Sequence, residues 1–230
     1  MKILKQNQLD NAVEYLQQGK TLVFPTETSY GLGCDATNQK AVDKIFKIKG
    51  RTSDKPLLVA AHTIEMAKKY LVWNDLLEKL ANKYWPGPLT IVGEYLSLRG
   101  ADSDEAISRF CSDNKGIATS LSSFVPRNDN LADGVVSQDN TIAIRVTAHP
   151  LLSSIIEKLD RPLVATSANL ADAGDIYSAS EATKVFSGQN QKPDIIIDSG
   201  ELPRRLPSTV VSAVGGQLKI LRQGELVINI

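Results

Sequence analysis

Residues 21–33 read TLVFPTETSYGLG and carry the first clear structural signal of the chain. Residues 21–24 form a short apolar run that ends at Pro25, which predicts a buried strand. Residues 26–33 are polar and contain two glycines, so we expect a loop directly after this strand. Open α/β sheets hold their ligands beyond the ends of strands, which makes this loop a candidate wall of a binding site.

Outward from this stretch, helix and strand patterns alternate, and strands cluster toward the end of the chain. Apolar periodicity predicts helices over residues 10–18, 41–49, 63–70, 75–84, 151–159 and 181–186. Apolar runs predict further strands over residues 56–60, 89–92, 141–146, 162–165, 194–197, 208–213 and 217–221, the last two joined by a hairpin at Gly215-Gly216. Residues 93–138 show no steady period, which predicts an insertion or a long loop. We therefore predict one α/β domain over residues 1–230, a twisted mixed sheet flanked by helices.

Composition excludes several classes of function. Lysine and arginine number 26, as do aspartate and glutamate, so the formal net charge is zero and any basic site must be local. Two cysteines and two histidines are too few for a disulfide scaffold and make a zinc site or a Ser-His triad unlikely. The P-loop, the dinucleotide-binding glycine motif and the metalloprotease motif are all absent from the sequence. The chain starts without an apolar leader and has no run long enough to cross a bilayer, so a cytoplasmic protein without membrane contact is expected.

Two pairs of polar residues share the same spacing in distant loops. Lys49 and Arg51 flank Gly50 at the end of a predicted helix, and Ser167 and Asn169 follow a predicted strand. The two cations could neutralise a polyphosphate, with arginine as a bidentate donor, but basic residues also complement a helix C-terminus. The serine and asparagine could bind phosphate or sugar, and they could equally cap a helix or form a turn. Spacing alone leaves both alternatives open.

Other polar residues lie at the ends of predicted elements. Arg145 ends an apolar strand, so its charge needs a partner, which favours a site. Thr26, Glu27 and Thr28 could contact a small polar ligand, or the two threonine hydroxyls could be satisfied within the loop. His149 precedes Pro150 and is expected to begin a helix rather than to act as a base.

The ordered set of motifs resembles the YrdC-type threonylcarbamoyl-AMP synthase family. Outside residues 93–138, the resemblance spans nearly the whole chain. The matching stretches are FPTETSYGLG at 24–33, KGR at 49–51, KPL at 55–57, WPGPLT at 85–90, AIRVTAHP at 143–150, TSAN at 166–169, STVV at 208–211 and LRQG at 221–224.

The resemblance implies a fold with a concave basic cleft and an enzyme that joins L-threonine, bicarbonate and ATP, with Mg²⁺, into L-threonylcarbamoyladenylate and pyrophosphate. The product would pass to a threonylcarbamoyl-transferase complex that modifies tRNA. Carried over by motif, the catalytic pair is Lys49 and Arg51, with no protein metal ligand. The implied ATP contacts are Lys49, Arg51, Lys55, Thr141, Ser167, Asn169 and Arg222, and the implied threonine contacts are Thr28, Arg145 and Ser208.

The chain also departs from the family pattern. Longer members carry Asn and His where this chain has Lys55 and Ala60, with His62 two residues on, which resembles the shorter bacterial branch without the extra C-terminal domain. The usual serine after the Ser-x-Asn motif is missing, and Ser178 is its candidate replacement. Three alternatives remain: a module that binds tRNA or double-stranded RNA without making an adenylate, a carbamoyl-adenylate-forming domain of a hydrogenase-maturation enzyme, and an inactive partner in a tRNA-modifying complex.

Overall fold

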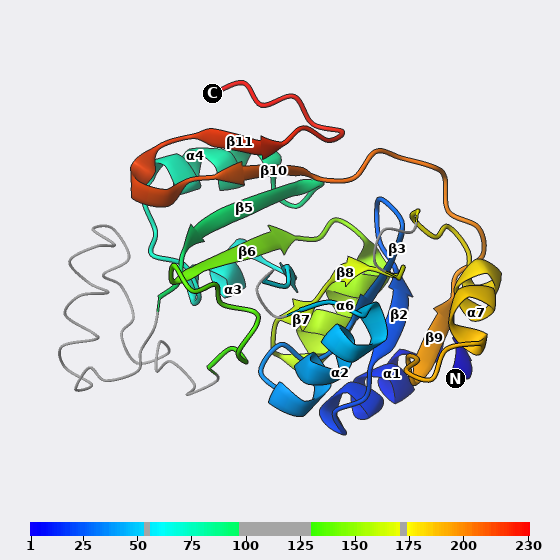
Figure 1. The fold of residues 1–230 in the computed structure, drawn as a ribbon. Helices are drawn as coiled ribbons and strands as arrows, with labels where there is room; N and C mark the ends of the chain where they lie inside the picture. The colour runs from blue at the N-terminus through cyan, green and yellow to red at the C-terminus, as the bar shows by residue number, and fades with distance from the viewer. Residues whose placement is uncertain (53–55, 97–129, 171–173) are drawn as a thin grey trace.

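The computed structural model describes residues 1–52, 56–96, 130–170 and 174–230 (Figure 1). The predicted α/β class is confirmed, and in these residues the strands are divided between two mixed sheets, here named sheet A and sheet B. Helices pack against both sheets, and the apolar residues between them form one continuous buried core.

Sheet A combines strands from the N-terminal part of the chain with strands from its second half. In the described residues its order is β1 (Lys2–Lys5), β9 (Ile195–Asp198), β2 (Leu22–Pro25), β3 (Tyr30–Gly33) and β8 (Thr166–Ser167). Strand β9 runs parallel to both β1 and β2, whereas β3 is antiparallel to β2 and to β8. Figure 1 shows this arrangement as an orange strand beside a blue one.

Sheet B contains most of the strands from the second half of the chain. Its order in the described residues is β11 (Lys219–Arg222), β10 (Thr209–Ser212), β5 (Leu89–Glu94), β6 (Thr141–Val146), β4 (Val59–Ala61) and β7 (Leu163–Val164). The predicted hairpin is confirmed: β10 and β11 are antiparallel and connected by the short 3-10 turn η1 (Val214–Gly216). Gly215 and Gly216 both have positive φ angles, of 62° and 71°, which glycine adopts at little cost.

The helices lie close to their predicted positions. They are α1 (Leu9–Gln17), α2 (Gln39–Lys49), α3 (Ile64–Lys68), α4 (Asp75–Tyr84), α6 (Pro150–Leu159) and α7 (Ala179–Ser187). Helix α2 begins at Asn38, whose side chain accepts a hydrogen bond from the Ala41 amide, and ends at Gly50, which adopts φ 60°. Over the described ranges, none of these helices combines the length and the apolarity needed to span a bilayer.

Three sequence predictions need correction. Residues 30–33 form strand β3 rather than part of a loop, because Tyr30 and Leu32 are fully buried and the glycines that alternate with them permit close packing. Residues 2–5 form β1, which was not predicted because its burial pattern is mostly exposed. The strand predicted over 162–165 is β7, and the residues after it, predicted as a loop, begin with a further short strand, β8, which belongs to the other sheet.

The predicted insertion is only partly described. Its first residues, Gly93 and Glu94, complete β5, and near its end Leu131 and Val135 are buried in the core. Residues 97–129 lie outside the described part of the chain. That residues 1–230 form one domain with an insertion near 93–138 therefore stays a prediction.

The two sheets meet where the chain passes from β7 to β8. Ala165 is the residue between these strands, and its amide donates to the Leu58 carbonyl oxygen at 2.8 Å. Nearby, a β-carbon on Gly33 would lie 1.7 Å from the Val164 carbonyl oxygen, so only glycine permits this approach. Helix α6 contacts β2 in sheet A and β4 in sheet B. The junction brings polar residues from both sheets to one place.

Candidate active site

A cleft of about 320 Å³ lies at this junction of the two sheets. Sheet A supplies the turn between β2 and β3 together with β3 and β8, and sheet B supplies β6 and the approaches to β10 and β11. Its polar and charged lining consists of Thr26, Thr28, Ser29, Tyr30, Arg51, Arg145, Thr166, Ser167, Asp175, Ser208 and Arg222. Six residues proposed from sequence therefore line one cleft: Thr28, Arg51, Arg145, Ser167, Ser208 and Arg222.

Lys49 lies behind this cleft, at the last position of α2, and is buried. Its ammonium donates three hydrogen bonds: to the Ser167 carbonyl oxygen at 2.7 Å, to the Asn169 carbonyl oxygen at 3.0 Å and to Asn169 Oδ1 at 2.8 Å. Burial, followed by the nearby charge of Arg51, lowers the pKa of Lys49 to about 8, while Asp175 acts in the opposite direction. The structure thus brings three of the proposed residues, Lys49, Ser167 and Asn169, into one network.

The loop conformation separates Arg51 from Lys49. Because Gly50 ends the helix in the left-handed conformation, the chain reverses, and the Arg51 amide bonds back to the Phe46 carbonyl oxygen at 3.1 Å. Arg51 lines the cleft and is half-buried. Its guanidinium is therefore the cation that this loop presents to a ligand.

The turn between β2 and β3 is built on Thr26. Its hydroxyl donates to the Ser29 carbonyl oxygen at 2.7 Å and accepts from the amides of Thr28 and Ser29 at 3.2 Å each. The Thr28 hydroxyl lies 3.2 Å from that of Thr26. Both alternatives raised for these threonines therefore hold in part. The hydroxyl groups form hydrogen bonds within the turn, and Thr28 also lines the cleft.

Arg145 and Glu27 form a buried pair of opposite charges. Arg145 Nε lies 3.6 Å from Glu27 Oε1, and their side chains are only 6% and 11% exposed. Glu27 Oε2 accepts a hydrogen bond from the Thr147 hydroxyl at 3.1 Å. Among the described residues, neither Glu27 Oε1 nor Arg145 Nε has a hydrogen-bond partner, since 3.6 Å is too long for one.

His149 adjoins the same pair. It precedes Pro150 at the start of α6, as the sequence predicts, and its Nδ1 is buried without a hydrogen-bond partner in the described part of the chain. Burial lowers the pKa of His149, and the carboxylate of Glu27 opposes this shift. The imidazole is therefore neutral near pH 7.

Ser208 and Arg222 are already paired to each other. Arg222 donates from Nη2 to the Ser208 carbonyl oxygen at 2.9 Å and to Ser208 Oγ at 3.2 Å. Ser208 Oγ also lies 3.0 Å from the hydroxyl of Thr90. Burial lowers the pKa of Arg222, an effect that Asp175 opposes and Arg145 reinforces.

Two further predicted residues that the structure describes, Thr141 and Ser178, do not line the cleft. Thr141 begins β6, four residues before Arg145, and its hydroxyl lies 2.8 Å from that of Ser137. Four strand residues span about 13 Å, so Thr141 belongs to the far end of the strand. Ser178 caps α7, its hydroxyl accepting from the Glu181 amide at 3.1 Å. Lys55 lies outside the described residues.

Sequence reasoning assigned no role to Thr147 or Asp175, and it named Glu27 only together with its loop neighbours as a contact for a small polar ligand. In the sequence, Glu27 lies in a polar loop and looks like a solvent-exposed acid. Only its ion pair with Arg145 in the structure indicates that it belongs to the site. Thr147 lies two residues after Arg145, the spacing that places both on one face of an extended segment, and this signal was available in the sequence. Asp175 is the one acid among the described residues that line the cleft.

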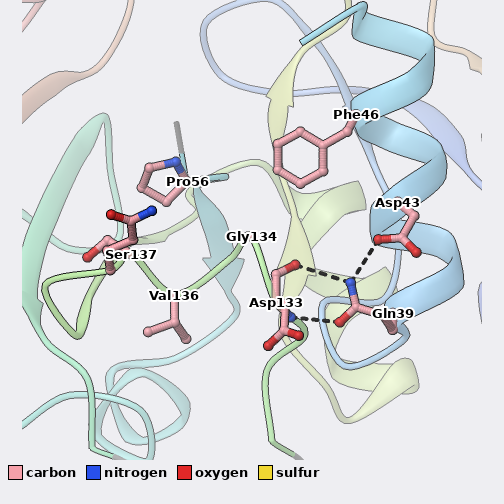
Figure 2. Close-up of a pocket in the computed structure, with 9 residues that line it drawn as sticks. Gln39, Asp43, Phe46, Pro56, Asp133, Gly134, Val136 and Ser137 are labelled. Carbon is pink, nitrogen blue, oxygen red and sulfur yellow. Dashed lines mark hydrogen bonds between the residues drawn. The ribbon is translucent and has the colours of Figure 1, made fainter. Parts of the chain in front are cut away.

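A second hollow, of about 430 Å³, lies between α2 and residues 133–138 (Figure 2). It shares no lining residue with the cleft among the described residues. Figure 2 shows one of its lining side chains, Gln39, bonded to Asp43 and Asp133; Gln39 Nε2 donates to Asp43 Oδ1 at 2.8 Å, and Gln39 Oε1 accepts from the Asp133 amide at 2.7 Å. Because Gln39 is already paired within the protein, we place the active site in the cleft between the sheets.

Comparison with known proteins shows which family this chain resembles. The model of the Sua5/YciO/YrdC family, described as "Telomere recombination", matches residues 14–122 and 100–224. A threonylcarbamoyl-AMP synthase of Pyrococcus abyssi is 31% identical over 94% of this chain and 53% of its own length. One of Psychromonas ingrahamii is 28% identical over 94% of this chain and 97% of its own length. The crystal structure of P. abyssi Sua5 complexed with L-threonine superposes with a TM-score of 0.74 at 29% identity, over 97% of this chain and 58% of that one.

Proposed function

Because this chain belongs to the Sua5/YciO/YrdC family, we propose that it makes L-threonylcarbamoyladenylate from L-threonine, bicarbonate and ATP, releasing pyrophosphate. The chain spans about half the length of the P. abyssi relative and nearly all of the P. ingrahamii relative. The observation that carries the proposal is the convergence of three arginines with three hydroxyl side chains in one cleft: Arg51, Arg145 and Arg222 with Thr28, Ser167 and Ser208. A volume of about 320 Å³ suits small molecules and not an RNA duplex.

The cleft offers separate places for the two larger substrates. We assign the phosphates of ATP to Arg51 and Arg222, since guanidinium groups bind phosphate oxygens as charged, bidentate donors. We assign the carboxylate and hydroxyl of L-threonine to Arg145, Thr28 and Ser208. The structure of P. abyssi Sua5 complexed with L-threonine supports a threonine site in this fold.

The proposed reaction needs positioning and charge stabilisation more than covalent chemistry. The amine of threonine and bicarbonate give N-carboxy-threonine with loss of water, and the carboxylate oxygen of this carbamate attacks the α-phosphorus of ATP as pyrophosphate leaves. Holding the two reactants in line can contribute on the order of 7–11 kcal/mol. The Arg51 guanidinium would stabilise charge that develops on the phosphates during the attack.

Magnesium would accompany ATP rather than occupy a site built by the protein. In the described part of the chain, no group of three potential metal-binding side chains occurs. Mg²⁺ is commonly held by substrate phosphates and one or two carboxylates, and Asp175 is the acid available in the cleft. The metal, when bound, would neutralise phosphate charge.

The product is an activated carbamoyl group, so its consumer must be a group-transfer reaction. We propose that it passes in the cytoplasm to an enzyme complex that modifies tRNA. The alternative, an RNA-binding module, is disfavoured by the zero net charge of the chain.

The test is pyrophosphate release measured with ATP, threonine and bicarbonate, and again with each one omitted. We expect release only with all three, and an Arg51→Gln variant should lose at least tenfold in activity. Lys47→Gln is the matched control, because Lys47 is exposed in the last turn of the same helix and does not line the cleft. Release that ignores threonine, or salt-sensitive RNA binding without any release, would refute the proposal.

A further inference from the structure

The two cations that flank Gly50 differ in what remains of their hydrogen-bonding capacity. An ammonium group has three N–H donors. The three donors of Lys49 are matched by three oxygen acceptors within the protein, at 2.7, 2.8 and 3.0 Å. Lys49 is also only 5% exposed and does not line the cleft. A phosphate could bind Lys49 only by displacing one of these oxygens.

The acceptors of Lys49 all belong to one short turn. They are the backbone oxygens of Ser167 and Asn169 and the Asn169 side-chain oxygen. The same Oδ1 atom accepts a second hydrogen bond, from the Ser167 hydroxyl at 2.7 Å. Lys49 therefore fixes which way the Asn169 amide faces, since its oxygen must point toward the ammonium.

This orientation decides what Ser167 offers to a ligand. A hydroxyl has one donor and two acceptor lone pairs. Because the Ser167 hydroxyl donates to Asn169 Oδ1, its lone pairs remain for the cleft that Ser167 lines. Phosphate oxygens are acceptors and cannot use them. A sugar hydroxyl or an exocyclic amine of a base can donate to them.

We propose that Lys49 is a positioning residue that holds the Ser167–Asn169 turn for recognition of the nucleoside part of the nucleotide, and that it does not bind phosphate. This inference rests on the proposed function, and it assigns the phosphates to the arginines of the cleft. It also changes the role expected for Lys49 from the family resemblance, which placed the residue among the catalytic ATP contacts.

Binding of adenosine and of ATP, measured by calorimetry, separates the two roles. We expect Lys49→Met to weaken binding of both ligands by the same factor, at least tenfold, because each contains the nucleoside. Arg51→Gln should weaken ATP at least tenfold and leave adenosine unchanged. Lys47→Met, in the same helical turn, should change neither. A Lys49→Met protein that loses affinity for ATP alone would overturn the proposal.

A second measurement needs no ligand and so tests the turn independently of the proposed function. The amides of Ala168 and Asn169 donate to Tyr30 and Ser167. We expect Lys49→Met to speed their hydrogen exchange at least tenfold, and Lys47→Met to leave it unchanged. Unchanged exchange in Lys49→Met would overturn the positioning role.

Asn169→Ala provides the parallel variant, because it removes one acceptor of Lys49 and leaves the lysine in place. It should weaken adenosine and ATP equally, and its effect should not add to that of Lys49→Met. Additive effects would show that the two residues act separately and would contradict the proposal. A wild-type protein that binds neither ligand would refute the proposed function, while the exchange rates would still decide whether Lys49 holds the turn.

Discussion

The two walls of the cleft differ in how completely their polar groups are paired. On one wall, Ser167 lines the cleft and bonds to Asn169 and to Lys49 behind it, and all three donors of the lysine are used. On the other wall, Glu27 and Arg145 lie 3.6 Å apart, and each has a buried atom without a hydrogen-bond partner in the described residues.

This difference separates a preformed wall from one that a ligand completes. A paired network is ordered before binding, so a ligand meets groups already in place. A buried polar group without a partner costs about 1–3 kcal/mol, and a ligand that bonds to it recovers part of that cost. We therefore expect the Lys49 wall to set the geometry of the nucleotide, and the Arg145 wall to gain most from its substrate.

Arg145→Met should break the second wall most severely. It leaves the Glu27 carboxylate buried without its opposite charge, which costs about 3–5 kcal/mol when one partner of a buried pair is removed. Urea unfolding measures this loss. The double variant Glu27→Gln, Arg145→Met should recover most of the stability, because it removes both charges, but it should not recover activity. Equal stability of the single and double variants would show that the pair is not coupled.

Glu27→Gln tests the same wall more gently. The amide oxygen can still accept from Thr147, while the negative charge beside Arg145 is lost. We expect the KM for threonine to rise by the equivalent of about 1.5–3 kcal/mol, the scale of a charged hydrogen bond. The KM for ATP should stay within twofold, and a larger change in it than in the threonine KM would contradict the division of the cleft.

Alkaline pH should loosen the first wall. The pKa of Lys49 is lowered to about 8, so above this pH the ammonium becomes an amine with two donors, and one of its three acceptors loses its bond. We expect ATP affinity to fall about tenfold between pH 7 and 9 in the wild type, and Lys49→Met to lack this fall.

Above about pH 8, where ATP affinity falls, the contribution of Lys49 to stability should rise. The folded pKa of Lys49 lies below the ordinary value of 10.5, so the unfolded chain holds this proton more tightly. The contribution of Lys49 to the free energy of unfolding therefore rises with pH from about 8 to 10.5. Unfolding monitored at several pH values in wild type and Lys49→Met isolates this contribution. A parallel fall of stability and affinity would contradict the assignment.

Thr147→Val should have the smallest effect. The substitution keeps the shape of the side chain but removes its bond to Glu27 Oε2 and the bond that it accepts from the His149 amide. We expect a loss of about 1 kcal/mol in stability and a similar loss in threonine use, from denaturant titration and steady-state kinetics. A loss as large as that of Arg145→Met would show that Thr147 does more than orient the carboxylate.

The sequence was a sound guide to local structure and to the cationic residues. Apolar periodicity placed the helices, and alternation predicted the α/β class, because both depend on neighbouring residues. The division into two sheets was not predicted, since β9 must insert between β1 and β2 across more than a hundred residues. Strand β3 was missed because its glycines resemble a loop and its burial depends on distant contacts.

The role of each residue in the site was harder to predict than the identity of the residues that form it. Lys49 and Arg51 look equivalent in the sequence, and only the acceptors around Lys49 separate them. Thr141 was proposed as an ATP contact from the family resemblance, but its position along β6 relative to the cleft is a tertiary property that the sequence does not show. Glu27 carries no signal apart from its partner.

The passage from β7 to β8 through Ala165 has a mechanical consequence. At this place one residue of covalent chain connects the two sheets, and the cleft lies across the same seam. A substrate bound by Ser167 on one side and Arg145 on the other would add a noncovalent link between the two sheets. We therefore expect an occupied cleft to oppose movement of one sheet relative to the other at this seam.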